Sequence, residues 1–301
     1  MSLKDLFPNV LENIPMSEYS TFKAGGPAKF FAEPESVNEL QALIGACEES
    51  GTEFYVIGNG SNILFSDKGF DGLVIRIGAK GEFAELSASG TSVTAGAGCL
   101  LSKFGNECTA NSLTGAEFAC GIPGSVGGAV YMNAGAYGGE IKDICAEVTY
   151  LDLNGEVNVL EGAKCEFGYR KSVFERENYI VLKAKFELRE GNKEEISAYV
   201  KELQGKRSAS QPLTVPSAGS TFKRPEGYFA GALIQDAGLK GFKLDESGAQ
   251  VSPKHAGFVV NNEGKASATD IYRLIKHVIS EVYKNSGVTL EPEVRLIGDF
   301  D

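Results

Sequence analysis

The order of apolar and polar residues in the first quarter of the chain predicts short strands around one helix. Apolar runs at 28–33, 54–57 and 72–77 have the length and the β-branched or aromatic content of strands. A periodic segment, SVNELQALIGACEESG, lies between the first two runs. The succession of strand, helix, strand and strand is typical of a small α/β domain, which we expect to end near Gly78.

The helix between these strands carries its own start and stop signals. Ser36 with Glu39 three residues later is a capping box, and Gly51 has the conformational freedom to close the C-terminus. The apolar residues that recur at helical spacing are Leu40, Leu43, Ile44 and Cys47. We therefore expect an amphipathic helix that buries this face.

The middle of the chain is richer in strands. Two alternating segments, FAELSAS and SVTAGAG, precede a predicted helix at 101–111. The segment VTYLDLNGEVNVL predicts two strands joined at Asn154 and Gly155, a pair that favours the type I′ turn of a hairpin. A further strand is predicted at 179–188, so this part of the chain is expected to be α+β.

The last third begins where a helical segment is broken by the two prolines of SQPLTVPSAG, and we place a domain boundary near Ser208. Its expected elements are a helix at 229–237, a strand at 255–261, a long helix at 269–285 and a closing strand at 293–298. The apolar face of the long helix consists of Ile271, Leu274, Ile275, Val278 and Val282.

Composition narrows the class of protein. Hydrophobic residues make up 43% of the 301, enough for real cores, and neither a signal peptide nor a membrane-spanning apolar run is recognisable. The net charge of −11 disfavours binding to nucleic acid or to an anionic membrane. Six cysteines without a C-x-x-C and two histidines argue against a metal site. We expect a cytoplasmic protein with reduced thiols and, because no exposed apolar heptad is visible, a monomer.

Glycine is over-represented, with 37 residues, and gathers in two segments. The first, YVIGNGSN, places Gly58 and Gly60 directly after a buried strand, where backbone N–H groups can point at an anion. It departs from the dinucleotide motif G-x-G-x-x-G because Ile63 stands where the last glycine belongs. A plain tight turn is the alternative.

The second segment, GIPGSVGGAVYMNAGAYGG, spans 121–139 and contains no charged residue. A flexible linker is the alternative, but such linkers lack apolar residues like Ile122 and Tyr131. A large flat ligand with a pyrophosphate needs backbone almost in contact with it, and a Cβ would clash there. We therefore expect a wall of a nucleotide-cofactor site, with Tyr131, Asn133 and Tyr137 at the edges of the ring system.

Two further motifs hold polar residues that also have ordinary interpretations. GYRKSVF places Arg170 and Lys171 beside Tyr169, although such basic pairs are commonly solvated surface residues. EPEVRLIG places Glu293 at the start of a strand, where pairing with Arg295 would be unremarkable.

The motif SAGSTFKRP places Ser220 in a glycine-rich turn, with Lys223 and Arg224 close behind. A basic surface turn is the ordinary interpretation. No G-x-S-x-G surrounds the serine, which disfavours a serine hydrolase, and no glycine-lysine pair of the chain is followed by Ser or Thr, so a P-loop is absent.

Seven motifs together resemble, in order and spacing, those of the UDP-N-acetylenolpyruvoylglucosamine reductases (MurB). They are YSTFKAGGPA, YVIGNGSNIL, GIPGSVGGAVYMNAGAYG, GYRKSVF, SAGSTFKRP, HAGFVVN and EPEVRLIG, and they run over almost the whole chain. The resemblance implies an α+β fold: an FAD-binding two-lobe fold of the vanillyl-alcohol-oxidase type plus a third α+β substrate-binding domain. We expect lobe 1 at 1–78, lobe 2 at 79–207 and the substrate-binding domain at 208–301. Whether the C-terminal strand (about 289–301) packs with the FAD-binding lobes instead of the substrate-binding domain is left open.

The resemblance also implies an activity. A protein of this family is an FAD-dependent reductase that uses NADPH as co-substrate and converts UDP-N-acetylglucosamine enolpyruvate to UDP-N-acetylmuramate for peptidoglycan synthesis. Carried onto matching positions, Ser220 is the implied proton donor. Arg170 and Glu293 are the implied groups that stabilise the enolate, a role that suits a cation and a protonated carboxyl.

The implied binding residues fall into two sets. Those for the UDP-sugar are Tyr169, Lys223 and Arg224. Those for FAD are Gly58, Asn59, Gly60, Ser61, Asn62, Gly121, Ile122, Pro123, Gly124, Ser125, Gly127, Gly128, Tyr131, Asn133, Gly135, Ala136 and Tyr137. These local groups would explain how an acidic chain binds two anionic substrates.

Two features set this chain apart within the resemblance. Only a few residues separate Phe174 from Tyr179, where the longer form of the family inserts a substrate loop, so the chain resembles the shorter, type II form. Ser210 stands where the family usually has a lysine. The phosphate contact of that lysine is therefore in question, with Lys206 and Arg207 as possible substitutes.

Two other functions stay open at this point. An oxidase or dehydrogenase of another alcohol or sugar would keep the fold and change the chemistry. A nucleotide-sugar-binding protein with a degenerate flavin site would keep the binding alone, but the presence of Ser220, Arg170 and Glu293 argues against it.

Overall fold

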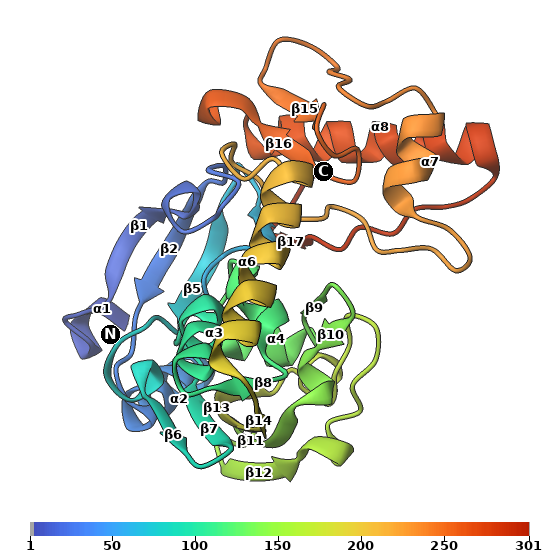
Figure 1. Ribbon diagram of the computed structural model, residues 1–301. Coiled ribbons are helices and arrows are strands. Elements are labelled where there is room, and N and C mark those ends of the chain that lie inside the picture. The colour runs from blue at the N-terminus through green and yellow to red at the C-terminus, as the bar shows by residue number, and fades with distance from the viewer. Residues whose placement is uncertain (1–2, 301) are drawn as a thin grey trace. The chain divides into compact units, whose positions relative to one another are not determined.

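The computed structural model describes residues 3–300 (Figure 1). Residue contacts divide the chain into two compact units. Unit 1 comprises Met1–Leu11, Phe31–Asn59 and Leu73–Arg207, and unit 2 comprises Glu12–Phe30, Gly60–Gly72 and Ser208–Asp301. Each unit is thus built from three separate stretches of chain. The expected division into two flavin-binding lobes and a substrate-binding domain stays a prediction, because compactness assigns no function to a stretch.

Unit 1 is centred on a five-stranded antiparallel sheet of order β12-β11-β13-β7-β6. The strands are β6 (Leu86–Ser89), β7 (Ser92–Gly96), β11 (Cys145–Leu151), β12 (Val157–Glu161) and β13 (Ile180–Glu187). Val148, Ala184 and Ala95 lie in register across the three middle strands and are all buried. Small side chains in this row let the helix α4 (Val126–Tyr131) pack against β7 and β13.

The other elements of unit 1 are mostly short. The helices are α1 (Leu3–Leu6), α2 (Val37–Ser50), α3 (Leu101–Ala110) and α5 (Val173–Arg176), and α6 (Lys193–Ser210) lies almost wholly in this unit. The remaining strands are β3 (Phe54–Ile57), β8 (Leu113–Thr114), β9 (Gly135–Ala136), β10 (Gly139–Glu140) and β14 (Arg189–Glu190). A further sheet has the strand order β1-β2-β5-β3 and contains β2 (Pro27–Ala32) and β5 (Phe70–Arg76).

Helix α2 confirms the predicted start, stop and buried face. The Ser36 hydroxyl accepts the Glu39 N–H, and Gly51 closes the helix in the left-handed region with φ of 65°. The predicted apolar residues are all buried. One detail differs: the Glu39 carboxylate accepts the N–H of Glu35 at 2.8 Å, one residue before the position that a capping box would use.

The β11–β12 hairpin forms as predicted, but its predicted type I′ turn is wrong. That turn needs a positive φ at both central residues; Gly155 has φ of 77°, whereas Asn154 is not among the positive-φ residues. The cause is the side chain of Asp152, whose Oδ1 accepts the N–H groups of Asn154 and Glu156 at 2.9 Å each. This local bonding closes a longer loop in place of the two-residue turn.

Unit 2 packs two helices against small strands. Its elements are β1 (Leu11–Pro15), β4 (Ile63–Phe65), α7 (Ala230–Asp236), β15 (Ala249–Val251), β16 (Val259–Asn261), α8 (Ala268–Ser286) and β17 (Arg295–Ile297). Helix α8 contacts α7 and the antiparallel β15–β16 pair, as Figure 1 shows. The predicted apolar face of α8 is completely buried in the core of this unit. The strand expected at 255–261 is shorter, because the preceding residues form a hydrogen-bonded turn.

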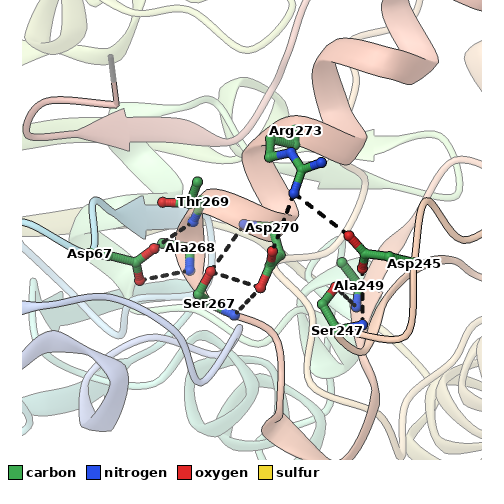
Figure 2. A network of polar contacts seen from close by, with 9 residues as sticks. All are labelled: Asp67, Asp245, Ser247, Ala249, Ser267, Ala268, Thr269, Asp270 and Arg273. Carbon is green, nitrogen blue, oxygen red and sulfur yellow. Dashed lines mark hydrogen bonds and ion pairs between the residues drawn. The ribbon is translucent and has the colours of Figure 1, made fainter.

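The start of α8 is held by a network of polar contacts, drawn in Figure 2. Ser267 and Asp270 form a capping box, and the Asp67 carboxylate accepts the N–H groups of Ala268 at 2.9 Å and Thr269 at 2.7 Å. Partial burial acts to raise the pKa of Asp67, but hydrogen bonds from Thr269, Ala268 and Ser267 outweigh it and lower the pKa. Asp67 thereby fastens the 60–72 segment to the helix.

Among residues 3–300, no helix is long and apolar enough to cross a membrane.

Candidate functional site

The glycine-rich segment of unit 1 is more ordered than the sequence indicated. The sequence patterns predict no helix or strand within this segment, but Val126–Tyr131 forms helix α4, and the end of the segment forms the β9–β10 pair. Ser125 caps α4 by accepting the N–H of Gly128 at 3.4 Å. The glycines concealed this helix because they lower helix propensity.

Several glycines of this segment make room for the chain itself. A Cβ on Gly127 would lie 2.8 Å from the Ala97 Cβ, and one on Gly139 would lie 2.6 Å from the ring of Phe118. A Cβ on Gly135 would meet the Gly139 carbonyl oxygen at 2.7 Å. The expectation that all these glycines clear space for a ligand is therefore too broad.

Two glycines of this segment have no neighbouring atom that would exclude a Cβ. A Cβ on Gly128 would meet only the Ser125 hydroxyl, at an ordinary 3.5 Å, and one on Gly138 would meet nothing within 4 Å. Because Gly138 has φ of 90°, its backbone conformation already explains the glycine, so Gly128 is the position of the two at which a ligand can account for it. Tyr137, the neighbour of Gly138, is 42% exposed, in keeping with a side chain at the edge of a binding site.

The two glycine-rich segments meet within unit 1. A Cβ on Gly58 would lie 2.3 Å from the Ser125 Oγ, so Gly58 permits a close approach between the segments. Neither segment contains an acidic residue. The small, uncharged donors gathered here fit the diphosphate of a dinucleotide, for which a carboxylate would be repulsive.

Asn133 lies inside the protein. Its side chain is fully buried and donates to the Glu140 carboxylate at 2.8 Å and to the Gly168 carbonyl at 2.9 Å, while its Oδ1 accepts the Lys142 N–H at 2.9 Å. These bonds give Asn133 a structural role, joining the glycine-rich segment to the GYRKSVF motif. Its expected contact with a cofactor ring stays a prediction.

Arg170 belongs to the same region. It has φ of 56°, and its Nη2 donates to the Gly135 carbonyl at 3.2 Å. Its guanidinium lies 5.0 Å from the centroid of the Tyr169 ring, which is itself about half exposed. Partial burial acts to raise the pKa of Glu140, but hydrogen bonds and the charges of Lys142 and Arg170 lower it overall. A cation is thus fixed against the glycine-rich segment.

Unit 2 places Ser220 and Glu293 on one junction. The residue after Ser220, the buried Thr221, donates its N–H to the Gly257 carbonyl at 2.9 Å and accepts the Glu293 N–H at its carbonyl at 2.8 Å. The Thr221 Oγ1 accepts the Val259 N–H at 2.9 Å. The Ser220 side chain itself is exposed, beside Gly219 with φ of 75°. We call this arrangement the Thr221 junction.

The end of the first glycine-rich segment reaches the same junction. The Asn62 amide donates to the Glu293 carbonyl at 3.0 Å, and the Asn62 carbonyl accepts the Arg295 N–H at 3.0 Å. The cause is the parallel pairing of β4 with β17, which sets Ile63 opposite Arg295. Unit 2 therefore brings together an expected cofactor residue and two expected catalytic residues.

The basic residues after Ser220 occupy different surroundings. Lys223 forms an ion pair with Glu291, and its backbone N–H bonds to the carbonyl of the same residue. Arg224 lies in an exposed loop, with its guanidinium 3.9 Å from the Phe229 ring centroid and its Nε donating to the Tyr228 carbonyl at 3.3 Å. Both cations are held in place by neighbours.

The two substitutes considered for the missing lysine also differ. Lys206 forms an exposed ion pair with Glu202 at 2.6 Å. Arg207 instead enters a small pocket beside Gly121 and Tyr137 and donates to the Gly121 carbonyl. Burial lowers the pKa of Arg207, although it stays well within the protonated range at neutral pH. No local pattern predicts this burial, because Arg207 occupies a helical position like any other.

The described part of the chain contains no disulfide and no metal site. All six cysteines are buried and none forms a disulfide. Burial raises the pKa of Cys47 to about 11 and that of Cys108 to about 12, so these thiols are poor nucleophiles. Within residues 3–300, no group of His, Cys, Asp and Glu has the arrangement of a metal site.

Comparison with known proteins agrees with this geometry. The family described as "FAD binding domain" matches residues 28–161, and the family described as "UDP-N-acetylenolpyruvoylglucosamine reductase, C-terminal domain" matches residues 211–297. The crystal structure of UDP-N-acetylenolpyruvylglucosamine reductase (MurB) from Thermus caldophilus has a TM-score of 0.82 at 35% identity, covering 95% of this chain and 98% of that one. The fold and the paired glycine-rich segments thus define an α+β, FAD-binding oxidoreductase, as expected.

Curated relatives narrow the class further. A UDP-N-acetylenolpyruvoylglucosamine reductase from Agathobacter rectalis is 50% identical, covering 97% of this chain and 95% of the relative. One from Clostridium beijerinckii is 48% identical, with 98% and 97% covered. The chain belongs to the UDP-N-acetylenolpyruvoylglucosamine reductase (MurB) family.

Proposed function

We propose that this protein reduces the enolpyruvyl ether of its UDP-sugar with Ser220 as proton donor and with Arg170 and Glu293 as the groups that stabilise the intermediate. As a member of its family, the protein is an FAD-dependent UDP-N-acetylenolpyruvoylglucosamine reductase of peptidoglycan synthesis, with NADPH as co-substrate. The observation that carries the residue assignment is the Thr221 junction, which sets an exposed serine beside Glu293.

The glycine-rich segments are the proposed holders of FAD. Gly58 and Ser125 approach closely, and the segments offer backbone N–H groups and small polar side chains without an acid. Gly128 and Tyr137 present the open positions. When bound, FAD supplies the hydride that the enolpyruvyl methylene carbon receives. Every other task falls to side chains of this chain.

Arg170 is the proposed group that stabilises the negative charge developing on the substrate. Addition of a hydride to the methylene carbon leaves an electron pair on the adjacent carbon, shared with its carboxylate. A guanidinium can stabilise that charge through two parallel N–H bonds, and Arg170 is already oriented by the Gly135 carbonyl. The stacked Tyr169 restricts the side chain further and is the proposed substrate contact.

Ser220 completes the reduction by proton transfer. Its hydroxyl gives a proton to the carbon that carries the electron pair, and the resulting alkoxide takes a proton from solvent. The buried Thr221 fixes the backbone on one side of Ser220, while the serine itself stays exposed. The Glu293 N–H donates to the Thr221 carbonyl, so the backbone of Thr221 helps to position both Ser220 and Glu293.

Within unit 2, Lys223 and Arg224 are the proposed contacts for the UDP-sugar. We favour Arg207 over Lys206 as the substitute for the missing lysine, because Lys206 is neutralised by Glu202. Arg207 lies beside the glycine-rich segment instead. We further propose that the protein acts as a monomer in the cytoplasm and has no nucleic-acid or membrane partner.

The assignment is tested by following the two half-reactions of Ser220→Ala separately in a stopped-flow spectrophotometer. Bleaching of the flavin by NADPH should proceed at nearly the wild-type rate, because that step needs no proton from serine. Reoxidation by the enolpyruvyl substrate should slow by about 10²–10⁴-fold, the usual contribution of general acid catalysis. Ser220→Cys, which keeps a transferable proton, should recover part of the loss. A variant that is slow with NADPH and normal with the substrate would refute the role.

A further inference from the structure

His255 is hydrogen-bonded to Gly257, whose carbonyl belongs to the Thr221 junction. Its imidazole Nδ1 accepts the Gly257 N–H at 3.1 Å, and its ring lies 4.9 Å from the Phe258 ring, edge to face. Two glycines make room for the imidazole: a Cβ on Gly257 would lie 3.1 Å from its Cε1, and one on Gly231 of α7 would lie 3.6 Å from the same atom. The half-buried ring is therefore closely fitted.

The turn that carries His255 is itself well fixed. The Ser252 hydroxyl accepts the N–H groups of Lys254 and His255 at 3.2 Å each. The Ser252 N–H bonds to the Phe258 carbonyl at 2.8 Å, and the Phe258 N–H bonds to the His255 carbonyl at 3.0 Å. Within this turn, the Gly257 N–H is bonded to the titratable side chain of His255.

Gly257 connects this turn to the proposed proton donor. While its N–H bonds to His255, its carbonyl accepts the N–H of Thr221, the residue that follows Ser220. The Thr221 carbonyl in turn accepts the Glu293 N–H. One series of hydrogen bonds thus runs from the imidazole through Gly257 and Thr221, the residue bonded to Ser220, to the N–H of Glu293.

We infer that His255 is a positioning residue: its neutral imidazole fixes the Gly257 peptide and, through it, the Ser220 turn in the orientation that proton transfer requires. The inference rests on the proposed role of Ser220. It predicts that protonation of His255 disturbs the turn, because a protonated Nδ1 cannot accept a hydrogen bond.

The surroundings keep the ring neutral at the pH of the cell. Burial lowers the pKa of His255 below its ordinary value of 6.5; a hydrogen bond to its own backbone offsets part of this, and the charge of Lys240 lowers the pKa further. Gly231 and Phe258, which pack against the ring, carry no charge, and the ammonium of the adjacent Lys254 is directed to the Ser208 carbonyl. Activity should therefore be full at neutral pH and fall as the pH drops through the pKa of His255.

The chain offers matched variants. His255→Asn keeps an acceptor at the same distance from the backbone and removes the titration, since an Asn side chain readily accepts the N–H two residues on. His255→Leu removes the acceptor. His277→Asn is the control, because His277 is the other histidine of the chain and stacks on Phe242 at a centroid distance of 4.9 Å.

The experiment measures both half-reactions of the FAD-loaded enzyme as a function of pH, with the pKa of His255 taken from imidazole NMR signals that His255→Asn assigns. The wild type and His277→Asn should lose substrate-dependent reoxidation below that pKa, and His255→Asn should not. His255→Leu should be slower by roughly three- to tenfold at every pH, the effect of one lost hydrogen bond. Flavin reduction by NADPH should be equal in all four proteins.

Two results would overturn the inference: an acid limb that persists unchanged in His255→Asn, or a His255→Leu variant as fast as the wild type in the substrate half-reaction. Ser220→Ala separates this failure from failure of the proposed function. If Ser220→Ala is slow while the His255 variants are normal, the serine keeps its role and His255 loses its own. If Ser220→Ala is normal, the assignment of the proton donor is wrong.

Discussion

The two regions that carry the proposed chemistry are built in opposite ways. The glycine-rich region of unit 1 combines contacts between near neighbours, such as Ser125 with Gly128, with contacts over moderate separations, such as Arg170 with Gly135 at 35 positions. The Thr221 junction of unit 2 joins distant segments, and the bond from Asn62 to Glu293 crosses 231 positions. The glycine-rich region can therefore be recognised from a contiguous sequence motif, whereas the Thr221 junction forms only when the chain folds.

The difference also concerns what a conspicuous residue means. In unit 1 the glycines are conspicuous, yet Gly127, Gly135 and Gly139 accommodate the protein's own atoms. In unit 2 the decisive groups are backbone N–H and carbonyl groups of Thr221 and Gly257, which every residue except proline carries. The sequence motifs therefore predict the glycine-rich region better than the Thr221 junction. Even in the glycine-rich region they overestimate how many glycines make room for a ligand.

The largest effect should come from Arg170, on the unit 1 side of the comparison. Arg170→Lys keeps the charge but loses the planar fork that meets both the Gly135 carbonyl and a developing oxyanion. We expect the substrate half-reaction to slow by about 10²–10³-fold, as for removal of one oxyanion donor. Lys171→Ala, at the exposed neighbour, is the control and should change little. Near-normal turnover by Arg170→Lys would make Arg170 a surface residue.

A pair of alanine variants should separate the two uses of glycine in unit 1. Gly127→Ala places a Cβ 2.8 Å from the Ala97 Cβ and should destabilise the fold by about 1–3 kcal/mol. Gly128→Ala meets only the Ser125 hydroxyl, at 3.5 Å, so the fold should keep its stability while flavin binding weakens. Chemical denaturation and flavin content measure the two effects. Equal stability of the two variants would show that Gly127 and Gly128 do not differ in their importance for packing.

The smallest effect should appear in unit 2, at the contact between Asp67 and α8 drawn in Figure 2. Asp67→Asn should lower the free energy of unfolding by about 1 kcal/mol at neutral pH, as for loss of a helix cap. Because the folded-state pKa of Asp67 is lowered, its contribution is complete above the unfolded pKa and is lost as the pH falls through the folded value. The difference between wild type and variant should therefore vanish in acid.

Asp71→Asn is the matched control for that measurement. Asp71 lies in the same segment but forms an exposed ion pair with Lys29, and such pairs contribute little. A deficit for Asp71→Asn as large as that for Asp67→Asn would show that the helix contact is not the cause.

Local signals explain which elements could be predicted from the sequence. Helix α2 was predictable because its cap, periodicity and terminal glycine all lie within one segment, and α8 for the same reason. Helix α4 was missed because glycines weaken its pattern and Ser125 is its only strong signal. The hairpin was predictable but its turn was not, because the Asp152 side chain competes with the Asn-Gly preference.

The candidate site was predictable to a different degree in each unit. The motifs identified Ser220, Arg170 and Glu293 by resemblance, but no local pattern could show that the Glu293 N–H bonds to the carbonyl of Thr221, the residue after Ser220. The burial of Arg207 was hidden because its partner Gly121 lies 86 positions away. His255 bonds locally to Gly257, and only the bond from Gly257 to the distant Thr221 links it to the proposed site. Pairings of this kind arise from tertiary structure alone.

A single anaerobic turnover tests the central claim most directly, namely that this chain is an FAD-dependent reductase of the enolpyruvyl UDP-sugar. The purified protein should show the visible absorption of flavin and lose it on addition of NADPH. It should regain that absorption when UDP-N-acetylglucosamine enolpyruvate is added, with a product heavier by two hydrogen atoms, and not when UDP-N-acetylglucosamine is added. A bleached flavin that the enolpyruvyl compound fails to reoxidise would contradict the account.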